Sequence, residues 1–396
     1  MKQFSILCFS LFLILHSCFA ATPRTKINGL EMAVKMADSE IKLFPEPWTV
    51  DFNPQPTWNY TQGLIAFSMM KLWKENGNDT YLKYAKTYAD KFIGTDGVIS
   101  HYDLADYNID AVNSGKFLFD LYEQTKDERY LKAIGHLREQ LKNHPRTLEG
   151  GFWHKKRYPY QMWLDGLYMG APFYAQYAQY YKEPNLFHDV VNQFVLVHKR
   201  TYNPATGLNY HGWDERKFQK WADPQTGCSP NYWGRAEGWY AMALVDVLDF
   251  LPKDFSGRVK ILEILNQVAA GIKKYQDPKT GLWYQVLDQG GRDGNYLEAT
   301  ASSMFSYALL KAVRMGYINK YYKAVAEKGY TGIVEHLIKT NEDGTISLTK
   351  CCAVAGLGGN PYRDGSYEYY VNETVRDNDP KGVGPFILAS IEFSLN

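Results

Sequence analysis

A helical unit recurs six times along the chain, and this repetition constrains the fold more than any other feature of the sequence. Each unit pairs an amphipathic segment with a segment that begins with small or polar residues and becomes strongly apolar. The amphipathic segments lie at about residues 27–43, 78–93, 127–141, 185–200, 257–274 and 320–339. The apolar segments are WNYTQGLIAFSMMKLWKE, IDAVNSGKFLFDLYE, WLDGLYMGAPFYAQYAQYY, GRAEGWYAMALVDVLDFL, LEATASSMFSYALLKAVRMGY and GPFILASIEFSL.

The amphipathic segments are predicted to form outer helices, and the apolar segments, whose small residues allow close approach, inner helices. Six such alternations predict an all-α fold, a closed six-hairpin (α/α)6 barrel or toroid; an open superhelical solenoid is the alternative. Closure is favoured because the last apolar segment runs to the terminus without a polar cap. No linker rich in Pro, Gly or Ser divides the chain, so residues 21–396 are predicted to form a single domain.

Residues 1–20 have the three-part pattern of a secretory signal peptide: Lys2, an apolar run to Leu15, and then small residues. The protein is therefore expected to be exported, as a periplasmic protein or an outer-membrane lipoprotein of a bacterium. Cys18 after Leu15-His16-Ser17 resembles a lipobox and is a candidate lipid anchor, while ordinary cleavage after Ala20 is the alternative. No later stretch reaches the ~20 apolar residues of a membrane helix, so no membrane span is expected.

The composition argues against nucleic acid as a partner, because 44 Lys and Arg balance 43 Asp and Glu. Aromatic residues make up 15% of the chain, more than a core needs, and such rings often stack on the flat faces of sugars. Packing between helices is the alternative for most of them. Phosphate-binding glycine loops and a GxSxG elbow are absent from the sequence, and the His and Cys spacings match no metal motif. Neither a metal nor a cofactor is expected.

In a ring of this kind, the loops that enter the inner helices gather at one mouth. Asp110, Asp165, Arg235, Glu237 and Glu298 lie at or near the starts of inner segments. Acidic residues there can simply satisfy the helix dipole. Arg235 needs another explanation, because a cation near a helix start is unfavourable unless an anion compensates. An anionic ligand at the mouth is therefore predicted.

Three histidines follow recurring turns that contain glycine, at His101, His154 and His211. Because these positions are equivalent in the repeat, the histidines are expected to face the same mouth. The sequence therefore predicts a cavity that carries carboxylates and has aromatic walls.

Five segments of the sequence are similar to those of a known enzyme family. In chain order they are YNIDAVNSGKFLF, FWHKKRYPYQMWLDGLYMGAPFYA, TGLNYHGWDE, WGRAEGWYAMALVDVLDFLP and LEATASSMFSYALLKAVRMGYI. Together they resemble the unsaturated rhamnogalacturonyl hydrolases, glycoside hydrolase family 105, from about Trp58 to the end of the chain. The related family 88 unsaturated glucuronyl hydrolases share that fold and chemistry. The resemblance implies an (α/α)6 barrel without a cofactor that acts on an unsaturated oligosaccharide.

The resemblance also implies roles for single residues. Asp165 in WLDG matches the general acid and base, and Asp110 in YNID matches an assisting carboxylate. The positions that match the wall of the sugar pocket are Tyr60, His154, Trp163, His211, Arg235 and Trp239. Glu237 is assigned no role. Repulsion by Asp110 and burial are expected to raise the pKa of Asp165.

The implied reaction removes a 4,5-unsaturated uronic acid from the non-reducing end of oligosaccharides that lyases generate. It proceeds by hydration of the C4=C5 vinyl ether. Two alternatives stay open: a conventional α/α-barrel glycosidase that cuts saturated glycans, and a non-catalytic exported protein that binds glycans. Rhamnose, galactose or another sugar is compatible with the +1 site, next to the scissile bond.

Overall fold

The computed structural model describes residues 27–396. The predicted signal peptide, with the candidate anchor Cys18, lies outside the described residues. Within residues 27–396 no helix has both the length and the apolar character that crossing a membrane requires.

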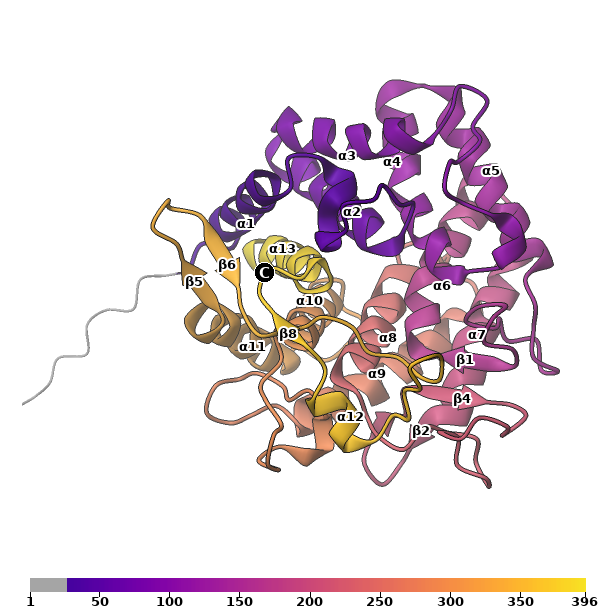
Figure 1. Ribbon diagram of the computed structural model, residues 1–396, viewed down its shortest axis with the longest axis vertical. Coiled ribbons are helices and arrows are strands. Elements are labelled where there is room, and N and C mark those ends of the chain that lie inside the picture. Colours follow the sequence, from indigo (N-terminus) through magenta and orange to yellow (C-terminus); the bar gives the residue numbers. More distant parts are fainter. Residues whose placement is uncertain (1–26) are drawn as a thin grey trace, which may run out of the picture.

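Six outer and six inner helices alternate along the chain, as the repeat predicts. The outer helices are α1 (Gly29–Leu43), α3 (Asp79–Phe92), α5 (Glu128–Asn143), α7 (Leu186–Thr201), α9 (Arg258–Lys274) and α11 (Tyr322–His336). The inner helices are α2 (Tyr60–Asn76), α4 (Lys116–Thr125), α6 (Leu164–Tyr180), α8 (Gly234–Val247), α10 (Ala299–Arg314) and α13 (Pro380–Leu395). Figure 1 shows inner helices around the centre of the ring and outer helices at its periphery.

The ring is closed by contact between its first and last inner segments. The inner segment before α4 is a 3₁₀ segment, η3 (Ile109–Gly115), and it packs against both α2 and α6. Helix α6 packs against α8, α8 against α10, α10 against α13, and α13 returns to α2. The closed (α/α)6 barrel is therefore confirmed, and the solenoid alternative is wrong.

Packing explains why the two kinds of helix differ in sequence. The outer helix α3 buries one face, including Tyr81, Tyr84 and Tyr88, whereas every residue of the inner helix α8 is buried. Inner helices also need small residues where backbones approach. A Cβ atom added to Gly63 in α2 would lie 2.2 Å from the Ser114 hydroxyl oxygen, so a larger residue there would push the segments apart.

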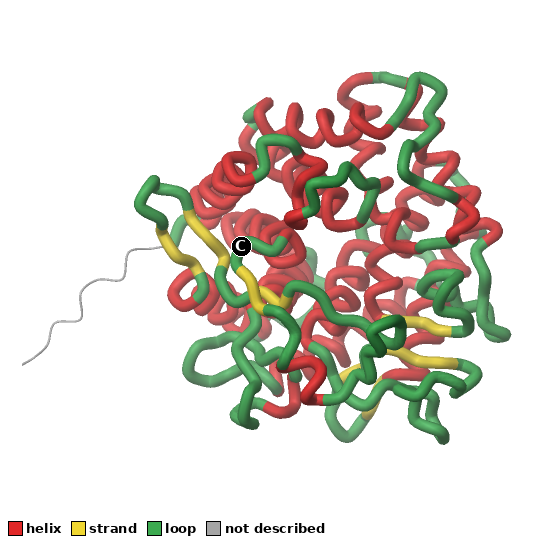
Figure 2. The backbone as a smooth tube through the Cα atoms, viewed as in Figure 1, coloured by secondary structure: helices red, strands yellow, loops and turns green. Residues whose placement is uncertain are grey.

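Short antiparallel two-stranded sheets, which the periodicity did not predict, lie in the connections between helices (Figure 2). The paired strands are β1 (Gln161–Trp163) with β4 (Gly212–Asp214), β2 (Tyr202–Asn203) with β3 (Leu208–Asn209), β5 (Ile338–Thr340) with β6 (Ile346–Leu348), and β7 (Cys351–Cys352) with β8 (Val375–Arg376). The further short helical segments are η1 (Pro47–Phe52), η2 (Leu104–Asp106), η4 (Leu287–Gln289) and α12 (Tyr367–Val371). The excursion 353–374, which carries α12, joins β7 to β8.

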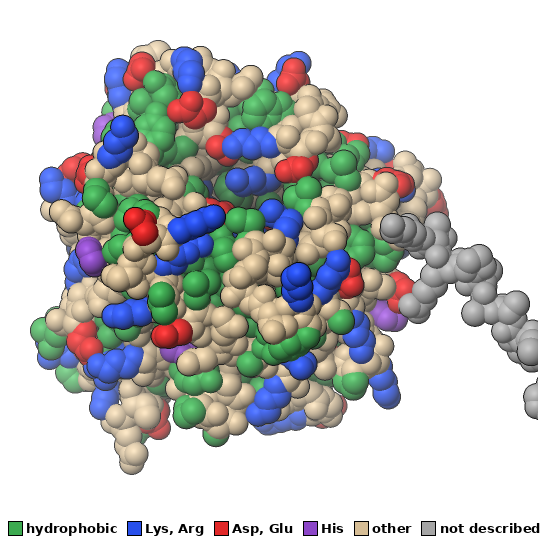
Figure 3. Space-filling view, turned by 180° about the vertical axis from the view of Figure 1, so that it is seen from behind, with side chains coloured by type: hydrophobic (Ala, Val, Ile, Leu, Met, Phe, Trp, Pro, Cys, Tyr) green, Lys and Arg blue, Asp and Glu red, His purple; other side chains and the backbone are tan. Residues whose placement is uncertain are grey.

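The surface carries both signs of charge. Figure 3 views the molecule from behind and shows Lys and Arg side chains interspersed with Asp and Glu over that face. This mixture agrees with the formal net charge of +1 for the whole chain.

Candidate active site

A cavity of about 590 Å³ opens where inner helices begin. It is lined by Asp51, Asn53, Asn59, Tyr60, Asn108, Asp110, His154, Lys155, Arg157, Tyr158, Trp163, Asp165, Met169, Ala353, Val354, Ala355, Arg363, Arg376 and Lys381. Five of the eight residues that the family resemblance assigns to the site therefore line the same cavity: Tyr60, Asp110, His154, Trp163 and Asp165.

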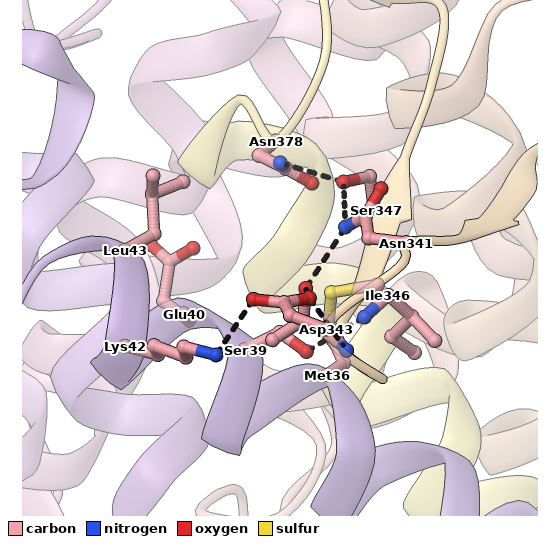
Figure 4. A pocket seen from close by; sticks show the side chains of 11 residues that line it. Met36, Ser39, Glu40, Lys42, Leu43, Asn341, Asp343, Ile346, Ser347 and Asn378 are labelled. Carbon is pink, nitrogen blue, oxygen red and sulfur yellow. Dashed lines mark hydrogen bonds and ion pairs between the residues drawn. The ribbon is translucent and has the colours of Figure 1, made fainter.

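A smaller hollow of about 240 Å³ lies between α1 and the β5–β6 hairpin (Figure 4). Much of its polar lining is already engaged: Lys42 Nζ lies 2.6 Å from Asp343 Oδ2, and the Ser39 hydroxyl accepts a hydrogen bond from the Ile346 amide at 2.9 Å. It contains none of the predicted site residues. The larger cavity is therefore the candidate active site.

Asp165 lies in the first turn of α6, where its carboxylate meets His211. His211 Nε2 lies 3.2 Å from Asp165 Oδ2, within ion-pair distance, although the two atoms do not meet the angular criteria of a hydrogen bond. The antiparallel pairing of β1 with β4 brings the two residues together, because Trp163 is paired with Gly212. A Cβ atom on Gly212 would lie 2.9 Å from Trp163 Cδ1, so this close pairing favours glycine.

Tyr370 in α12 completes a chain of contacts to Asp165. Its hydroxyl lies 2.7 Å from His211 Nδ1, and both side chains are buried. We infer that the tyrosine donates its proton to Nδ1, since no other hydrogen-bond partner of this hydroxyl occurs among the described residues. The imidazole proton then lies on Nε2 and faces Asp165.

The expectation that the pKa of Asp165 is raised is wrong for the ligand-free protein. Burial acts to raise the pKa of Asp165, but His211, with His154 and Arg235, outweighs burial and holds the pKa below its ordinary value. Asp110 is not the dominant neighbour. The prediction failed because the register that places His211 beside Asp165 was not predicted.

Asp110 lies in η3 and is engaged by a lysine that the sequence reading missed. Lys155 Nζ lies 2.5 Å from Asp110 Oδ2, and His154 Nε2 lies 3.6 Å from Oδ1. Burial lowers the pKa of His154 to about 4, so this imidazole is neutral at neutral pH. Asp110 therefore has a cation as its closest charged neighbour, whereas Asp165 has an imidazole.

Nearly parallel rings form one wall of the cavity. Trp163 stacks on His154 with centroids 4.3 Å apart and on Tyr158 with centroids 4.9 Å apart. Such flat apolar surfaces suit the faces of sugar rings.

Three predicted pocket residues, His211, Arg235 and Trp239, lie behind the lining rather than in it. Trp239 supports Tyr60 edge to face, with ring centroids 6.2 Å apart. Arg235 donates a hydrogen bond to the Cys352 carbonyl and lies 4.5 Å from the Trp233 ring centroid. Within residues 27–396, no carboxylate lies within ion-pair distance of Arg235, so its charge is not neutralised by direct pairing.

Three other residues that the sequence analysis named, Glu298, Glu237 and His101, lie outside the cavity lining. Glu298 accepts hydrogen bonds from the Ala301 amide at 2.6 Å and the Cys352 amide at 2.9 Å. Burial raises the pKa of Glu237, which lies behind Asn209, to about 8. The prediction that His101 faces the mouth is wrong, because His101 is exposed and packs against Phe92.

The structure adds cationic residues to the lining. Lys155 and Arg157 lie just after His154 in HKKRY, so their closeness to a predicted site residue could have identified them. Arg363 and Arg376 come from the excursion and from β8, where the sequence shows no repeat. In the part of the chain that the structure describes, no three His, Cys, Asp or Glu side chains are grouped as a metal site would require.

The mouth of the helical barrel thus carries three carboxylates, stacked rings and several cations, an arrangement suited to binding a charged sugar. The model of glycosyl hydrolase family 88 matches residues 32–395, and the chain belongs to this family. The glycoside hydrolase from family 105 of C. acetobutylicum ATCC 824 is 45% identical, with a TM-score of 0.88, and the match covers 91% of this chain and 98% of that one. The family 105 resemblance is thus confirmed, and the protein is a glycoside hydrolase.

Two further relatives are more distant. The unsaturated rhamnogalacturonyl hydrolase YesR of Bacillus subtilis (strain 168) is 26% identical over 317 residues, which cover 78% of this chain and 84% of YesR. The unsaturated glucuronyl hydrolase of Bacillus sp. GL1 is 14% identical with a TM-score of 0.68, and the match covers 92% of this chain and 96% of that one. This second similarity concerns the fold alone.

Proposed function

We propose that the protein is an unsaturated uronyl hydrolase of the rhamnogalacturonyl type. It removes a 4,5-unsaturated uronic acid from the non-reducing end of oligosaccharides. The observation that carries the proposal is the unequal environment of the two carboxylates. Asp110 is engaged by Lys155 at 2.5 Å, which leaves Asp165, at the cavity wall beside the stacked rings, as the carboxyl group available for proton transfer.

The vinyl ether of the substrate explains why one such carboxyl group suffices. Protonated Asp165 donates its proton to C4, water adds to C5, and the carboxylate takes a proton from that water. The C5 hemiketal opens to a ketone, which leaves a hemiacetal at C1. The hemiacetal collapses to an aldehyde and releases the remaining saccharide as an alcohol, so one water is consumed for each bond cut.

Substrate binding supplies the protonated form of Asp165. The uronate brings a negative charge to the cavity and displaces water, and both changes raise the pKa of a neighbouring carboxyl group. Arg235, which lies behind the cavity lining without a carboxylate partner in residues 27–396, adds positive charge on this side of the site and favours an anionic substrate. His211 Nε2 can align with Asp165 when the complex forms, since catalytic hydrogen bonds are often loose in free enzymes.

The test follows loss of the ultraviolet absorbance of the conjugated double bond across a panel of lyase-generated oligosaccharides. Asp165→Asn keeps the side-chain shape but cannot transfer a proton, so turnover should fall by at least ~10²-fold while the fold and ligand affinity persist. Near-normal turnover of this variant would contradict the assignment.

Isotopes separate hydration from ordinary displacement. In heavy-oxygen water, hydration places the label on C5 of the released keto acid, and in deuterated water it places deuterium on C4. Displacement would label C1 and leave C4 untouched. A saturated substrate of the same sugar sequence should be inert, and its cleavage would support a conventional glycosidase instead.

The sequence of residues 1–20 supports the further proposal that the enzyme is exported and is either free in the periplasm or anchored through Cys18. The mass of the mature N-terminal peptide distinguishes a lipid-modified Cys18 from cleavage after Ala20. A mature chain that retains Met1 would contradict export.

A further inference from the structure

The hollow between α1 and the β5–β6 hairpin contains a buried carboxyl group without a partner (Figure 4). Glu40 lines this hollow and is only 2% exposed. Its Oε1 atom accepts no hydrogen bond, and no cation in residues 27–396 lies within ion-pair distance of its carboxylate. Dashed lines cross the hollow in Figure 4, but none reaches Glu40. A buried carboxylate in this state requires a proton or a cation to compensate its charge.

The side chains behind Glu40 leave its charge uncompensated. Asp51 and Asp379 act on Glu40 as like charges. Lys381 lies 3.2 Å from Asp51 and 3.0 Å from Asp379. Arg376 pairs with the same two aspartates. Two cations therefore accompany three carboxylates, and Glu40 is the carboxylate that neither cation reaches.

The lining of the hollow supplies further oxygen atoms. Besides Glu40, the side chains with oxygen atoms are those of Ser39, Asn341, Asp343, Thr345, Ser347 and Asn378. The Asn341 amide nitrogen donates to Thr345 and Ser347, while its side-chain oxygen accepts no hydrogen bond among the described residues. No His or Cys occurs among the described residues that line the hollow. Carboxylate, amide and hydroxyl oxygens suit hard cations rather than transition metals.

We propose that Glu40 and the surrounding oxygen atoms form a site for Ca²⁺, which links α1 to the turn of the β5–β6 hairpin. Ca²⁺ accepts about six to eight oxygen ligands in irregular geometry, including neutral oxygens and water, whereas Mg²⁺ requires nearly octahedral geometry and loses its waters reluctantly. The hollow of about 240 Å³ has room for the ion and several waters. This site needs no group of three His, Cys, Asp or Glu side chains, because one carboxylate acts together with neutral oxygens.

The charge of the lining sets the expected affinity. The other carboxylate of the hollow, Asp343, is neutralised by Lys42, whose Nζ lies 2.6 Å from Asp343 Oδ2. A single free carboxylate predicts weak binding, with a Kd of ~10⁻⁴–10⁻³ M, the range of extracellular Ca²⁺ modules.

Calorimetry with CaCl₂ at about pH 8.5 tests the site. Burial, with Asp379 and Asp51, raises the pKa of Glu40 to about 8, so this pH favours the ionised carboxylate. One Ca²⁺ should bind, and a concentration ~10-fold above the Kd should raise the Tm by about 2 °C. MgCl₂ should bind at least ~10-fold more weakly. The measurement uses no substrate, so its outcome is independent of the proposed function.

Two substitutions on α1 move the affinity in opposite directions. Glu40→Gln keeps the side-chain shape and removes the charge, so Ca²⁺ binding should be lost. Lys42→Gln removes a nearby cation and frees Asp343, so binding should tighten ~5-fold. The matched controls are Glu31→Gln and Lys35→Gln, because these exposed residues pair with each other at 2.8 Å on the same helix outside the hollow. Both controls should keep the wild-type affinity.

Absence of binding by the wild-type chain at about 10 mM CaCl₂ would overturn the site. Binding that persists in Glu40→Gln would also overturn it, and so would a rise in Tm that NaCl reproduces at equal ionic strength. If Glu40→Gln folds poorly, Lys42→Gln decides the test, because Lys42 is exposed and its substitution leaves the buried face of α1 intact. An unchanged Ca²⁺ affinity in Lys42→Gln would then contradict the proposal.

Discussion

His211 should control the pKa of Asp165. Among the influences on Asp165, burial is the largest and raises the pKa, while His211 is the strongest of those that lower it. His211→Phe keeps a ring in the buried space and removes both nitrogen atoms. Without them burial should dominate, and the pKa of Asp165 should rise.

The contact geometry bounds the magnitude. His211 Nε2 and Asp165 Oδ2 lie 3.2 Å apart without hydrogen-bond alignment, so the contact is weaker than the about 1.5–3 kcal/mol of a hydrogen bond to a charged group. In the proposed mechanism protonated Asp165 starts the reaction, so the pH above which kcat/KM declines should move upward together with the pKa of Asp165.

Two measurements check this shift: the pH dependence of kcat/KM and a carbon NMR titration of the Asp165 carboxyl group. His211→Phe leaves the buried Tyr370 hydroxyl without its partner, so the double variant His211→Phe/Tyr370→Phe separates loss of stability from the pKa effect. The control is His198→Phe, because His198 bonds Gln267 on an outer helix at 2.7 Å and should leave the profile in place. An Asp165 pKa that stays unchanged in His211→Phe would refute the reasoning.

Two further predictions concern proton binding. Substrate binding should be accompanied by uptake of up to one proton near neutral pH, because Asp165 is ionised in the free protein and the proposed mechanism requires it protonated. Calorimetry in buffers of different ionisation enthalpy measures this uptake, and zero uptake in the wild type would contradict the prediction. Burial raises the pKa of Glu237 to about 8, so above about pH 4.5 the folded protein keeps a proton that the unfolded chain releases. The free energy of unfolding should therefore decrease as the pH rises from about 4.5 to 8. Glu237→Gln should make this loss shallower in urea unfolding between pH 5.5 and 8; an unchanged slope would contradict it.

The helical framework could be predicted because it repeats. The alternation of amphipathic and apolar segments depends on local periodicity, and each of the twelve predicted segments overlaps a helix of the structure. Asp165 and Asp110 could be placed at the mouth because both lie at the starts of inner segments. The same reasoning could not predict that Ile109–Gly115 forms a 3₁₀ segment before α4. This segment packs against α2 and α6, and such contacts between distant parts of the chain are not visible in local periodicity.

The pKa of Asp165 and the cationic character of the cavity rim depend on contacts between distant parts of the chain. His211 reaches Asp165 through the register of two three-residue strands, and Tyr370 and Arg363 enter from the excursion 353–374. Neither the strands nor the excursion repeats elsewhere in the sequence. Sequence periodicity therefore predicted the barrel and its carboxylates but gave no signal for these neighbours.

The two carboxylates differ because different layers of the fold supply their neighbours. The loop that follows His154 provides Lys155, which holds Asp110 as an ion pair. The β1–β4 strand pair and α12 instead place beside Asp165 an imidazole that contacts a buried tyrosine. A carboxylate fixed against a lysine is suited to orient substrate hydroxyl groups, whereas one whose nearest partner is an imidazole is better suited to gain and lose a proton during each turnover. In the proposed mechanism, Asp110 therefore positions the substrate and Asp165 transfers the proton.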